Sequence, residues 1–130
     1  MPSPAIRIAL AAALMAIAAP AVASPIQPFT TQALRAAQAK GRPVLVDAYA
    51  SWCPTCRAQA PTIGAISRDP AFGRLVILRL DYDHQVQEKR DLGIRQQSTL
   101  IAFAGSRESG RATGITEPVA IRALAATALR

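Results

Sequence analysis

The sequence predicts an α/β domain in which a central mixed β-sheet is flanked by helices on both faces. Residues 44–49 and 75–80 are short apolar runs bounded by turn residues, which is typical of buried central strands. Residues 99–104 form a third such run, and a turn at 105–110 leads into a short return strand. Helical segments alternate with the first strands, so those strands should pair in parallel, whereas the final hairpin adds an antiparallel pair.

Two helices flank the first central strand in the sequence. Thr30 is suited to cap a helix that runs through TQALRAAQAK to Gly41. The next helix should follow Trp52 and bend at Pro61, because proline removes a hydrogen bond inside a helix. The positions expected to face inward are Ala60, Ile63 and Ile66.

Two further helices complete the predicted order. Residues 83–93 suit a polar surface helix that ends at Gly93. Thr116 is suited to cap a terminal helix. The apolar positions of this helix repeat at helical spacing and should form one buried face: Ile121, Leu124, Ala125, Ala128 and Leu129.

Residues 1–23 have the three parts of a secretory signal peptide. Arg7 supplies the positive region, residues 8–19 an uninterrupted apolar stretch, and residues 21–23 the small-x-small cleavage pattern. A membrane anchor is the alternative, but the apolar stretch is shorter than the roughly 20 residues that span a bilayer. We therefore expect export, to a bacterial periplasm, with no stable membrane insertion after cleavage. The predicted boundaries are a signal peptide at 1–23, an extended lead-in at 24–28 and one folded domain at 29–130.

The net charge of +7 does not indicate a nucleic-acid-binding protein. The basic residues are scattered rather than clustered, and few aromatic residues accompany them to stack on bases. Representative positions are Arg35, Arg57, Arg79, Arg95 and Arg111. A basic solvated surface is the preferred interpretation. The residues after position 23 suffice for one compact domain, which we expect to be a monomer.

The chain has only two cysteines, and they form the motif Cys53-Pro54-Thr55-Cys56. Cys53 follows the carboxyl end of a predicted strand, which is where α/β folds usually place their ligand-binding and catalytic residues. Residues i and i+3 in a first helical turn share one face, close enough for a small disulfide ring. The helix N-terminus favours a thiolate at Cys53, so Cys53 should attack and Cys56 should resolve the mixed disulfide. Pro54 should keep the helix start rigid, and Trp52 should cover one side of the pair.

Other interpretations of the pair are weaker. A purely structural disulfide would close a ring of about four residues and constrain the unfolded chain little. A zinc site would need two more ligands, and the chain offers only His84, which we expect to be a solvated surface residue. No metal and no cofactor is predicted, because thiol-disulfide exchange proceeds with the two sulfur atoms alone.

Two stretches of the chain carry a family resemblance. VLVDAYASWCPTCRAQAP resembles the strand, the W-C-x-x-C active site and the helix-kinking proline of the thioredoxin family, the proline here being Pro61. LGIRQQSTLIAFAGSRE resembles the family segment that normally reads G-I-x-x-x-P-T and continues into a strand, a turn and a hairpin. The resemblance implies a thioredoxin-like fold for the domain at 29–130 and thiol-disulfide exchange with protein clients.

The resemblance also implies roles for individual residues. Cys53 is the implied nucleophile and Cys56 the resolving thiol. Asp47 falls where the family has a buried acid, which can take and return the proton of Cys56. The alternative for Asp47 is a structural ion pair with Arg79. The implied substrate-binding positions are Trp52, Pro54, Ser98, Thr99 and Gly114, of which the last falls where the family has a glycine near the active-site surface.

Ser98 departs from the family pattern, because it stands where the family has a cis-proline that faces the cysteine pair. A cis bond before a residue other than proline costs about 2.5–4 kcal/mol, so the Gln97–Ser98 bond is either trans or a strained cis bond. Ser98 also brings a hydroxyl close to two thiols. This keeps an alternative function open, a Cu(I)-binding or delivery module that uses Cys53 and Cys56.

The sequence leaves the direction of electron transfer open. The Pro-Thr dipeptide between the cysteines is neither the Gly-Pro of typical thioredoxins nor the Pro-His of strongly oxidising periplasmic enzymes. By analogy with relatives that have a buried acid and a residue like Trp52, we favour a reductant or disulfide-repair role, with an unidentified redox partner that recycles the pair. A client-binding chaperone whose cysteines are secondary is a third alternative.

Overall fold

The computed structural model describes Met1, Ile17 and residues 25–130, so the predicted signal peptide lies almost entirely outside the described residues. Five strands form one sheet in the order β1-β3-β2-β4-β5. The strands are β1 (Ile26–Pro28), β2 (Val44–Tyr49), β3 (Val76–Asp81), β4 (Thr99–Ala104) and β5 (Arg107–Thr113). The helices are α1 (Thr31–Ala39), α2 (Pro54–Arg68), α3 (Val86–Asp91) and α4 (Pro118–Thr127), with a short 3₁₀ helix η1 (Pro70–Phe72). Within the described part of the chain, no helix is long and apolar enough to cross a bilayer.

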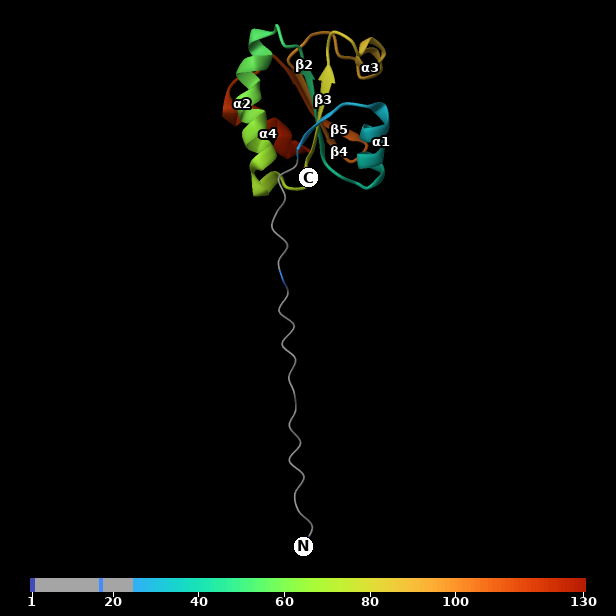
Figure 1. Cartoon of the computed structure of the whole chain (residues 1–130), viewed down its shortest axis with the longest axis vertical. Helices are drawn as coiled ribbons and strands as arrows, with labels where there is room; N and C mark the ends of the chain where they lie inside the picture. The colour runs from blue at the N-terminus through green and yellow to red at the C-terminus, as the bar shows by residue number, and fades with distance from the viewer. Residues whose placement is uncertain (2–16, 18–24) are drawn as a thin grey trace.

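The sheet is mixed and lies between two layers of helix, as the sequence predicts. β3 pairs in parallel with β1 and β2, whereas β4 pairs antiparallel with β2 and β5. In Figure 1, α2 and α4 lie on one side of the sheet and α1 and α3 on the other. The pairing sets Asp47 of β2 opposite Arg79 of β3 and Leu100 of β4.

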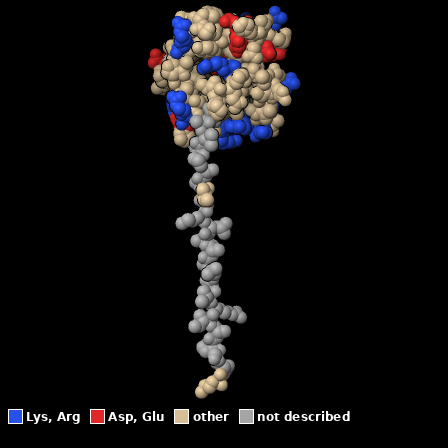
Figure 2. Space-filling view, viewed as in Figure 1, with Lys and Arg blue, Asp and Glu red and all other residues tan. Residues whose placement is uncertain are grey.

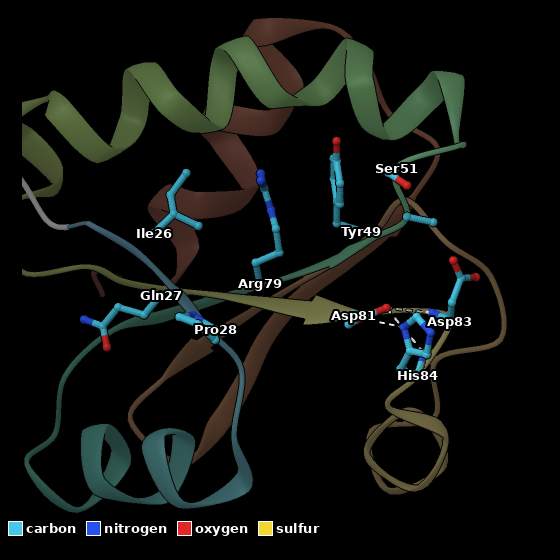
Figure 3. Close-up of a pocket in the computed structure, with 10 residues that line it drawn as sticks. Ile26, Gln27, Pro28, Tyr49, Ser51, Arg79, Asp81, Asp83 and His84 are labelled. Carbon is cyan, nitrogen blue, oxygen red and sulfur yellow. Dashed lines mark hydrogen bonds and ion pairs between the residues drawn. The ribbon is translucent and has the colours of Figure 1, made fainter.

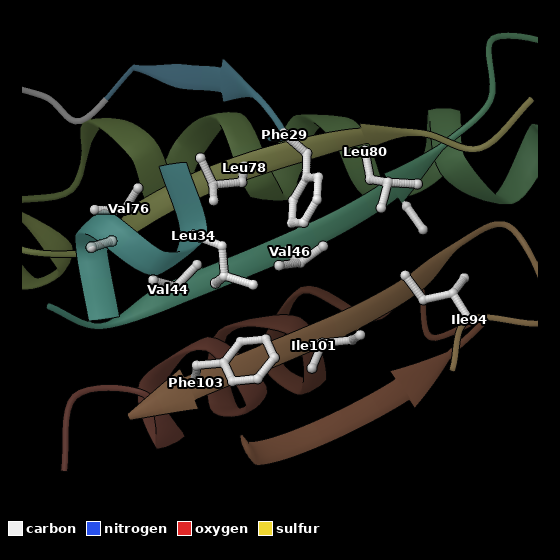
Figure 4. Packing of buried hydrophobic residues seen from close by; sticks show 12 residues of the cluster. Phe29, Leu34, Val44, Val46, Val76, Leu78, Leu80, Ile94, Ile101 and Phe103 are labelled. Carbon is white, nitrogen blue, oxygen red and sulfur yellow. The ribbon is translucent and has the colours of Figure 1, made fainter. Parts of the chain in front are cut away.

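Successive residues of β2 enter two different cores, because side chains along a strand point alternately to the two faces of the sheet. Val44 and Val46 join the core on the α1 side, together with Phe29 (Figure 4). Leu45 joins the core under α2 and α4. Each fully buried side chain of this kind stabilises the fold by about 1.5–3 kcal/mol. The same alternation assigns Asp47 to the face that α2 covers.

Residues 26–28, which the sequence assigns to an extended lead-in, form the edge strand β1 and pair with residues 77–79 of β3. The sequence pattern does not predict this strand, because the prolines at positions 25 and 28 are unfavourable in most strands. Proline is tolerated there because an edge strand has one side that needs no ladder hydrogen bond. The next residue, Phe29, is buried and its N–H donates to the carbonyl of Arg79 at 2.8 Å. The segment is therefore part of the folded domain.

The final hairpin and α3 differ in extent from their predictions. The turn consists of Gly105 and Ser106, with a φ of 61° at Gly105, so β5 already begins at Arg107. Positive φ suits glycine and produces the tight two-residue connection. α3 has six residues, Val86–Asp91, and is shorter than the predicted helix 83–93.

The terminal helix begins one residue later than a Thr116 cap would require. Its first residue is Pro118, whose fixed φ suits the first helical position, and Glu117 is at the N-cap. The buried residues of the predicted apolar face are Ile121, Ala125 and Ala128. Leu129, predicted to face the core, is 41% exposed because it lies beyond the last helical residue, Thr127.

The surface carries mixed charge. Figure 2 shows Lys and Arg side chains spread over one face of the domain with Asp and Glu between them, not gathered in one patch. Arg111 pairs with Glu108 at 2.6 Å, and such exposed pairs contribute about 0–1 kcal/mol each. This distribution agrees with a solvated basic surface.

Candidate functional site

The two cysteines lie at the junction between β2 and α2. The chain turns sharply after β2, and the N–H of Cys53 donates to the carbonyl of Ala50 at 3.1 Å. α2 then begins at Pro54, with Cys53 at the N-cap. The Sγ of Cys53 accepts a hydrogen bond from the N–H of Cys56 at 3.0 Å, in the position where a serine or aspartate oxygen usually caps a helix. Both side chains are free thiols, and the helix N-terminus favours negative charge on the sulfur that it contacts.

The pair is enclosed by protein. Cys53 and Cys56 are each 1% exposed and pack with Ala50, Tyr49 and Tyr82. The Tyr82 hydroxyl donates to the carbonyl of Arg95 at 3.1 Å, so this ring links the β3–α3 loop to the loop before β4. The aromatic side chains that pack against this cluster are Tyr49 and Tyr82, whereas Trp52, to which the sequence assigns the cover, is 53% exposed.

Cys56 is the more deeply held thiol. Burial and the hydrogen bond with Cys53 raise the pKa of Cys56 to about 11, against opposing contributions from the backbone amides of Ala50 and Ser98. Its Sγ lies 3.8 Å from the carbonyl oxygen of Ala48, which can accept the S–H proton. At neutral pH Cys56 is therefore protonated and needs a base before it can act as a nucleophile.

Asp47 is a buried acid that forms the ion pair with Arg79, which is the alternative that the sequence offers for it. It is 1% exposed, and its Oδ2 accepts a hydrogen bond from Nε of Arg79 at 3.0 Å. Its Oδ1 is buried and has no hydrogen-bond partner. Burial raises the pKa of Asp47, although Arg79 acts in the opposite direction. An acid with a raised pKa and an unpartnered oxygen on the sheet face under α2 is chemically suited to carry a proton.

A pocket of about 490 Å³ opens beside this ion pair. Figure 3 shows Arg79 and Tyr49 side by side, both pointing from the sheet toward α2. The guanidinium carbon of Arg79 lies 4.2 Å from the centre of the Tyr49 ring. At the other end of the pocket, the hydrogen bond that His84 donates to the carboxylate of Asp81 raises the pKa of His84, whose side chain is exposed as the sequence predicts. The pocket therefore gives solvent access to Arg79 and, through it, to the edge of the Asp47–Arg79 ion pair.

Trp52 is anchored on the surface beside the cysteine turn. Its side chain is 53% exposed, and its Nε1–H donates to both carboxylate oxygens of Asp83, at 3.1 and 2.9 Å. Pro54, at the first position of α2, is also exposed. These two residues form an open apolar surface next to the buried thiols.

Asp83→Ala is expected to release the Trp52 indole while leaving the cysteine pair in place. Hydrogen bonds to a charged but exposed group are worth about 1 kcal/mol, so in the disulfide exchange that the sequence predicts we expect KM to rise roughly threefold to fivefold with little change in kcat. Steady-state kinetics and the Trp52 fluorescence maximum measure the two effects. A fall in kcat with unchanged KM would contradict an anchoring role.

Ser98 lies against the pair in an unusual backbone conformation. Among the described residues no peptide bond is cis, and Ser98 is the one non-glycine residue with positive φ, at 61°. Its N–H donates to the carbonyl of Ala48 at 2.9 Å, and its carbonyl accepts from the N–H of Gly114 at 3.1 Å. Its hydroxyl donates to the carbonyl of Gln97. The Gln97–Ser98 bond is thus trans, and the hydroxyl is engaged by its own loop rather than directed freely at the thiols.

Ser98→Pro is expected to destabilise the fold by about 3 kcal/mol, because proline fixes φ near −65° and lacks the N–H that Ala48 receives. Ser98→Gly should change stability by no more than about 1 kcal/mol, since glycine adopts positive φ without steric cost. Urea unfolding of both variants measures the difference. Equal stability of the two would contradict the positive-φ conformation.

The remaining predicted positions divide into two groups. Thr99 is buried, and its hydroxyl bonds to the carbonyl of Gln96 and to the hydroxyl of Thr113, both at 2.8 Å, so it braces the loop from inside. Gly114 has a φ of 77° and lies against Ser98. The structure therefore connects Ser98 to Cys56 through the Ala48 carbonyl, places Gly114 beside Ser98, and turns the Thr99 hydroxyl to Gln96 and Thr113.

Sequence reasoning missed two residues of the site, Gln59 and Tyr82. Gln59 is fully buried in α2, and its side-chain amide donates to the carbonyls of Ser98 and Ile115. The helical spacing of the sequence could have indicated that Gln59 is buried, because Gln59 lies between Cys56 and Ile63 on the inward-facing side of the helix.

Within the described residues, no group of three or more His, Cys, Asp or Glu side chains could hold a metal ion. Beyond the two thiols, the Cu(I) alternative therefore has no third ligand of these types in the described part of the chain.

Comparisons with known proteins agree with the fold. The thioredoxin family model matches residues 26–127. Thioredoxin 1 of Nostoc sp. is 33% identical over 72 residues, which cover 55% of this chain and 66% of that protein. The thioredoxin of Synechocystis sp. is 35% identical with the same coverage. The match thus spans just under two thirds of the length of these relatives.

Solved structures give the same result over more of the chain. The crystal structure of Trxlp from Edwardsiella tarda is 36% identical, with a TM-score of 0.74, and the match covers 77% of this chain and 98% of that one. Thioredoxin of Malassezia sympodialis has a TM-score of 0.71 at 23% identity, covering 82% and 95%, which supports the fold alone. Together with the two adjacent cysteines at the start of α2, the homologues and the fold support thiol-disulfide oxidoreductase activity. The chain belongs to the thioredoxin family.

Proposed function

We propose that this protein is an exported oxidoreductase that reduces or exchanges disulfides in protein clients through Cys53 and Cys56. The observation that carries the proposal is the cap of α2, where the Sγ of Cys53 accepts the N–H of Cys56 at 3.0 Å. This contact holds the two sulfurs in one helical turn and supplies a donor to a Cys53 thiolate. Two buried thiols without a redox role would not need this arrangement.

The reaction begins when the Cys53 thiolate attacks one sulfur of a client disulfide. The client S–S bond breaks, a mixed disulfide forms, and one client sulfur leaves as a thiolate that takes up a proton. Cys56, once deprotonated, attacks the Sγ of Cys53, which forms the intramolecular disulfide and releases the second client thiol. Two electrons pass from the pair to the client, and a separate dithiol donor must reduce the pair again.

Asp47 is the proposed proton acceptor for Cys56. Burial raises its pKa, so it can hold a proton under conditions in which an exposed aspartate would not. Its Oδ1 has no partner, and Arg79 steadies the carboxylate from the other side. The acid lies on the sheet face that α2 covers, the same helix that carries Cys56, which supports proton transfer between them.

The proposed client surface consists of the exposed Trp52 and Pro54 and the backbone at Ser98 and Gly114. An extended client segment brings its disulfide to the edge of this surface. Because Cys53 is 1% exposed in the unbound protein, docking must uncover its sulfur before the client disulfide can reach it.

The proposal also includes export of the protein and electron transfer from the cysteine pair to the client. The signal-like pattern of residues 1–23 supports export to a periplasm. The raised pKa of Cys56 supports a reductant, because a reduced pair that is poorly stabilised as thiolate gives up its electrons more readily. A reduction potential below that of glutathione is the expected result.

Reduction of a peptide disulfide by dithiothreitol tests the proposed activity. The parent chain should accelerate the reaction catalytically, and Cys53→Ser should reduce the rate to the uncatalysed background. Thr55→Ser, which keeps the helix start and both thiols, is the matched control and should retain activity. No acceleration by the parent chain would refute the proposed function.

A further inference from the structure

Gln59 is a buried polar side chain in the middle of the helix that carries the cysteines. It is 0% exposed and occupies an inward position that Cys56, Ile63 and Ile66 share. Burying a side-chain amide costs free energy unless hydrogen bonds compensate for the lost water. An apolar residue at this position would avoid that cost, so the donors of Gln59 require an explanation.

The two N–H groups of Gln59 join α2 to two separate loops. Nε2 donates to the carbonyl of Ser98 at 3.1 Å and to the carbonyl of Ile115 at 2.8 Å. Gly114 completes the junction by donating its N–H to the same Ser98 carbonyl. The Oε1 of Gln59 is buried without a hydrogen-bond partner. The side chain thus uses its donors fully and its acceptor not at all, as expected of a residue kept for its N–H groups.

Ser98 needs such support because its conformation is unfavourable. A residue with a Cβ is sterically disfavoured in the left-handed region, and it stays there only if its surroundings hold it. The N–H of Ser98 is held by Ala48, and the carbonyl of Ser98 is held by Gln59 and Gly114. The peptide groups on both sides of Ser98 are therefore fixed.

This conformation matters for Cys56 because both residues share an acceptor. The carbonyl oxygen of Ala48 accepts the N–H of Ser98 at 2.9 Å and lies 3.8 Å from the Sγ of Cys56. The Ser98 N–H therefore meets the same oxygen that the thiol faces, and it offsets part of the negative charge of that oxygen beside the sulfur. Less negative charge at this oxygen favours the thiolate, and the Ser98 backbone acts to lower the pKa of Cys56, although burial raises that pKa overall. A proline at position 98 would have no N–H to offer.

We propose that Gln59 is a positioning residue for the resolving step: by clamping the Ser98 carbonyl it keeps the Ser98 N–H on the Ala48 oxygen that Cys56 faces, where that donor favours the Cys56 thiolate. The inference rests on the proposed function, since it assigns a way to ease the deprotonation of the resolving thiol. Gln59 acts through Ser98 and does not itself touch the client.

The reactivity of Cys56 alone tests this role. In the full chain with Cys53→Ser, Cys56 is the only thiol, and its rate of alkylation by iodoacetamide at pH 9 follows its thiolate fraction. Adding Gln59→Leu should lower that rate about tenfold, which corresponds to a rise of about one in the pKa of Cys56. Gln59→Met, which also lacks donors but keeps the unbranched shape, should give the same result if leucine fails to pack.

Two comparisons separate positioning from mere packing. Ser67→Ala removes one side-chain hydrogen bond from the same helix, to the carbonyl of Gly64, and should leave the rate unchanged. Simple loosening of the helix would expose the buried thiol and speed alkylation, which is the opposite sign. With Ser98→Gly also present, the effect of Gln59→Leu should shrink to about twofold or less, because glycine does not need the clamp to adopt positive φ.

An unchanged or faster alkylation rate in folded Gln59→Leu and Gln59→Met would overturn the proposal. So would an undiminished tenfold effect in the Ser98→Gly background. Catalysed reduction of a peptide disulfide by the parent chain, measured in parallel, shows whether the proposed function holds when the role of Gln59 does not.

Discussion

Cys56→Ser is expected to abolish catalytic turnover while leaving the first exchange step intact, so that clients accumulate as mixed disulfides on Cys53. Serine cannot attack a disulfide, and Cys56 is the one thiol available to release the client. We expect turnover to fall by about three orders of magnitude or more. Non-reducing electrophoresis of the variant incubated with an oxidised client, followed by mass mapping of the adduct, measures the trapped species.

Cys53→Ser serves as the matched control for this experiment. It should trap no client, because Cys56 is held inside the first turn of α2 with a pKa of about 11. Comparable adducts on Cys56 in the control would mean that the attacking and resolving roles are reversed.

Asp47→Asn is expected to stabilise the fold at neutral pH by about 1–3 kcal/mol. Burial raises the pKa of Asp47 above its ordinary value of 3.8, so the stability that its protonated form contributes is fully present below about pH 4. That contribution is lost as the pH rises through the folded-state pKa. Asparagine cannot ionise, so the free energy of unfolding of the variant should exceed that of the parent chain by a growing amount as the pH rises. Arg79 tolerates the change because its side chain is 31% exposed and can be hydrated from the adjacent pocket.

The same substitution should slow the release of clients, because Cys56 would lose its proton acceptor. A general base contributes about 10²-fold or more, and the loss should fall on the resolving step rather than on the attack by Cys53. Stopped-flow measurement of mixed-disulfide formation and decay separates the two steps, and urea unfolding from pH 4 to 8 measures stability. Asp91→Asn, a change at an exposed acid, is the control. Unaltered decay of the mixed disulfide in Asp47→Asn would leave Asp47 with a structural role only.

The central part of the fold was predictable because local and global signals agree there. β2 has the predicted bounds, since its residues are apolar on both faces and fit a strand covered by helices on two sides. β1 was not predictable from its pattern, because three residues between prolines carry no periodicity and form a strand only by pairing with β3. The helix boundaries that differ, at α3 and α4, depend on cap geometry and proline placement within a few residues.

The site was predictable to the extent that covalent spacing determines it. The distance of three positions between the cysteines and their location at a strand end place them in one helical turn. The conformation of Ser98 was not predictable, because it depends on hydrogen bonds from Ala48, Gly114 and Gln59, which lie far from it in the sequence. The cover over the thiols was likewise assigned to Trp52, the adjacent aromatic residue, although Tyr82 reaches them from another loop.

A single-turnover reaction tests the central claim most directly. The fully reduced chain is mixed with an excess of a peptide disulfide in the absence of any other reductant, and protein and peptide thiols are counted by mass spectrometry after quenching in acid. The account predicts that each chain reduces one peptide disulfide and ends with an intramolecular Cys53–Cys56 disulfide. Cysteines that remain free, with the peptide still oxidised, would contradict a redox role for the pair.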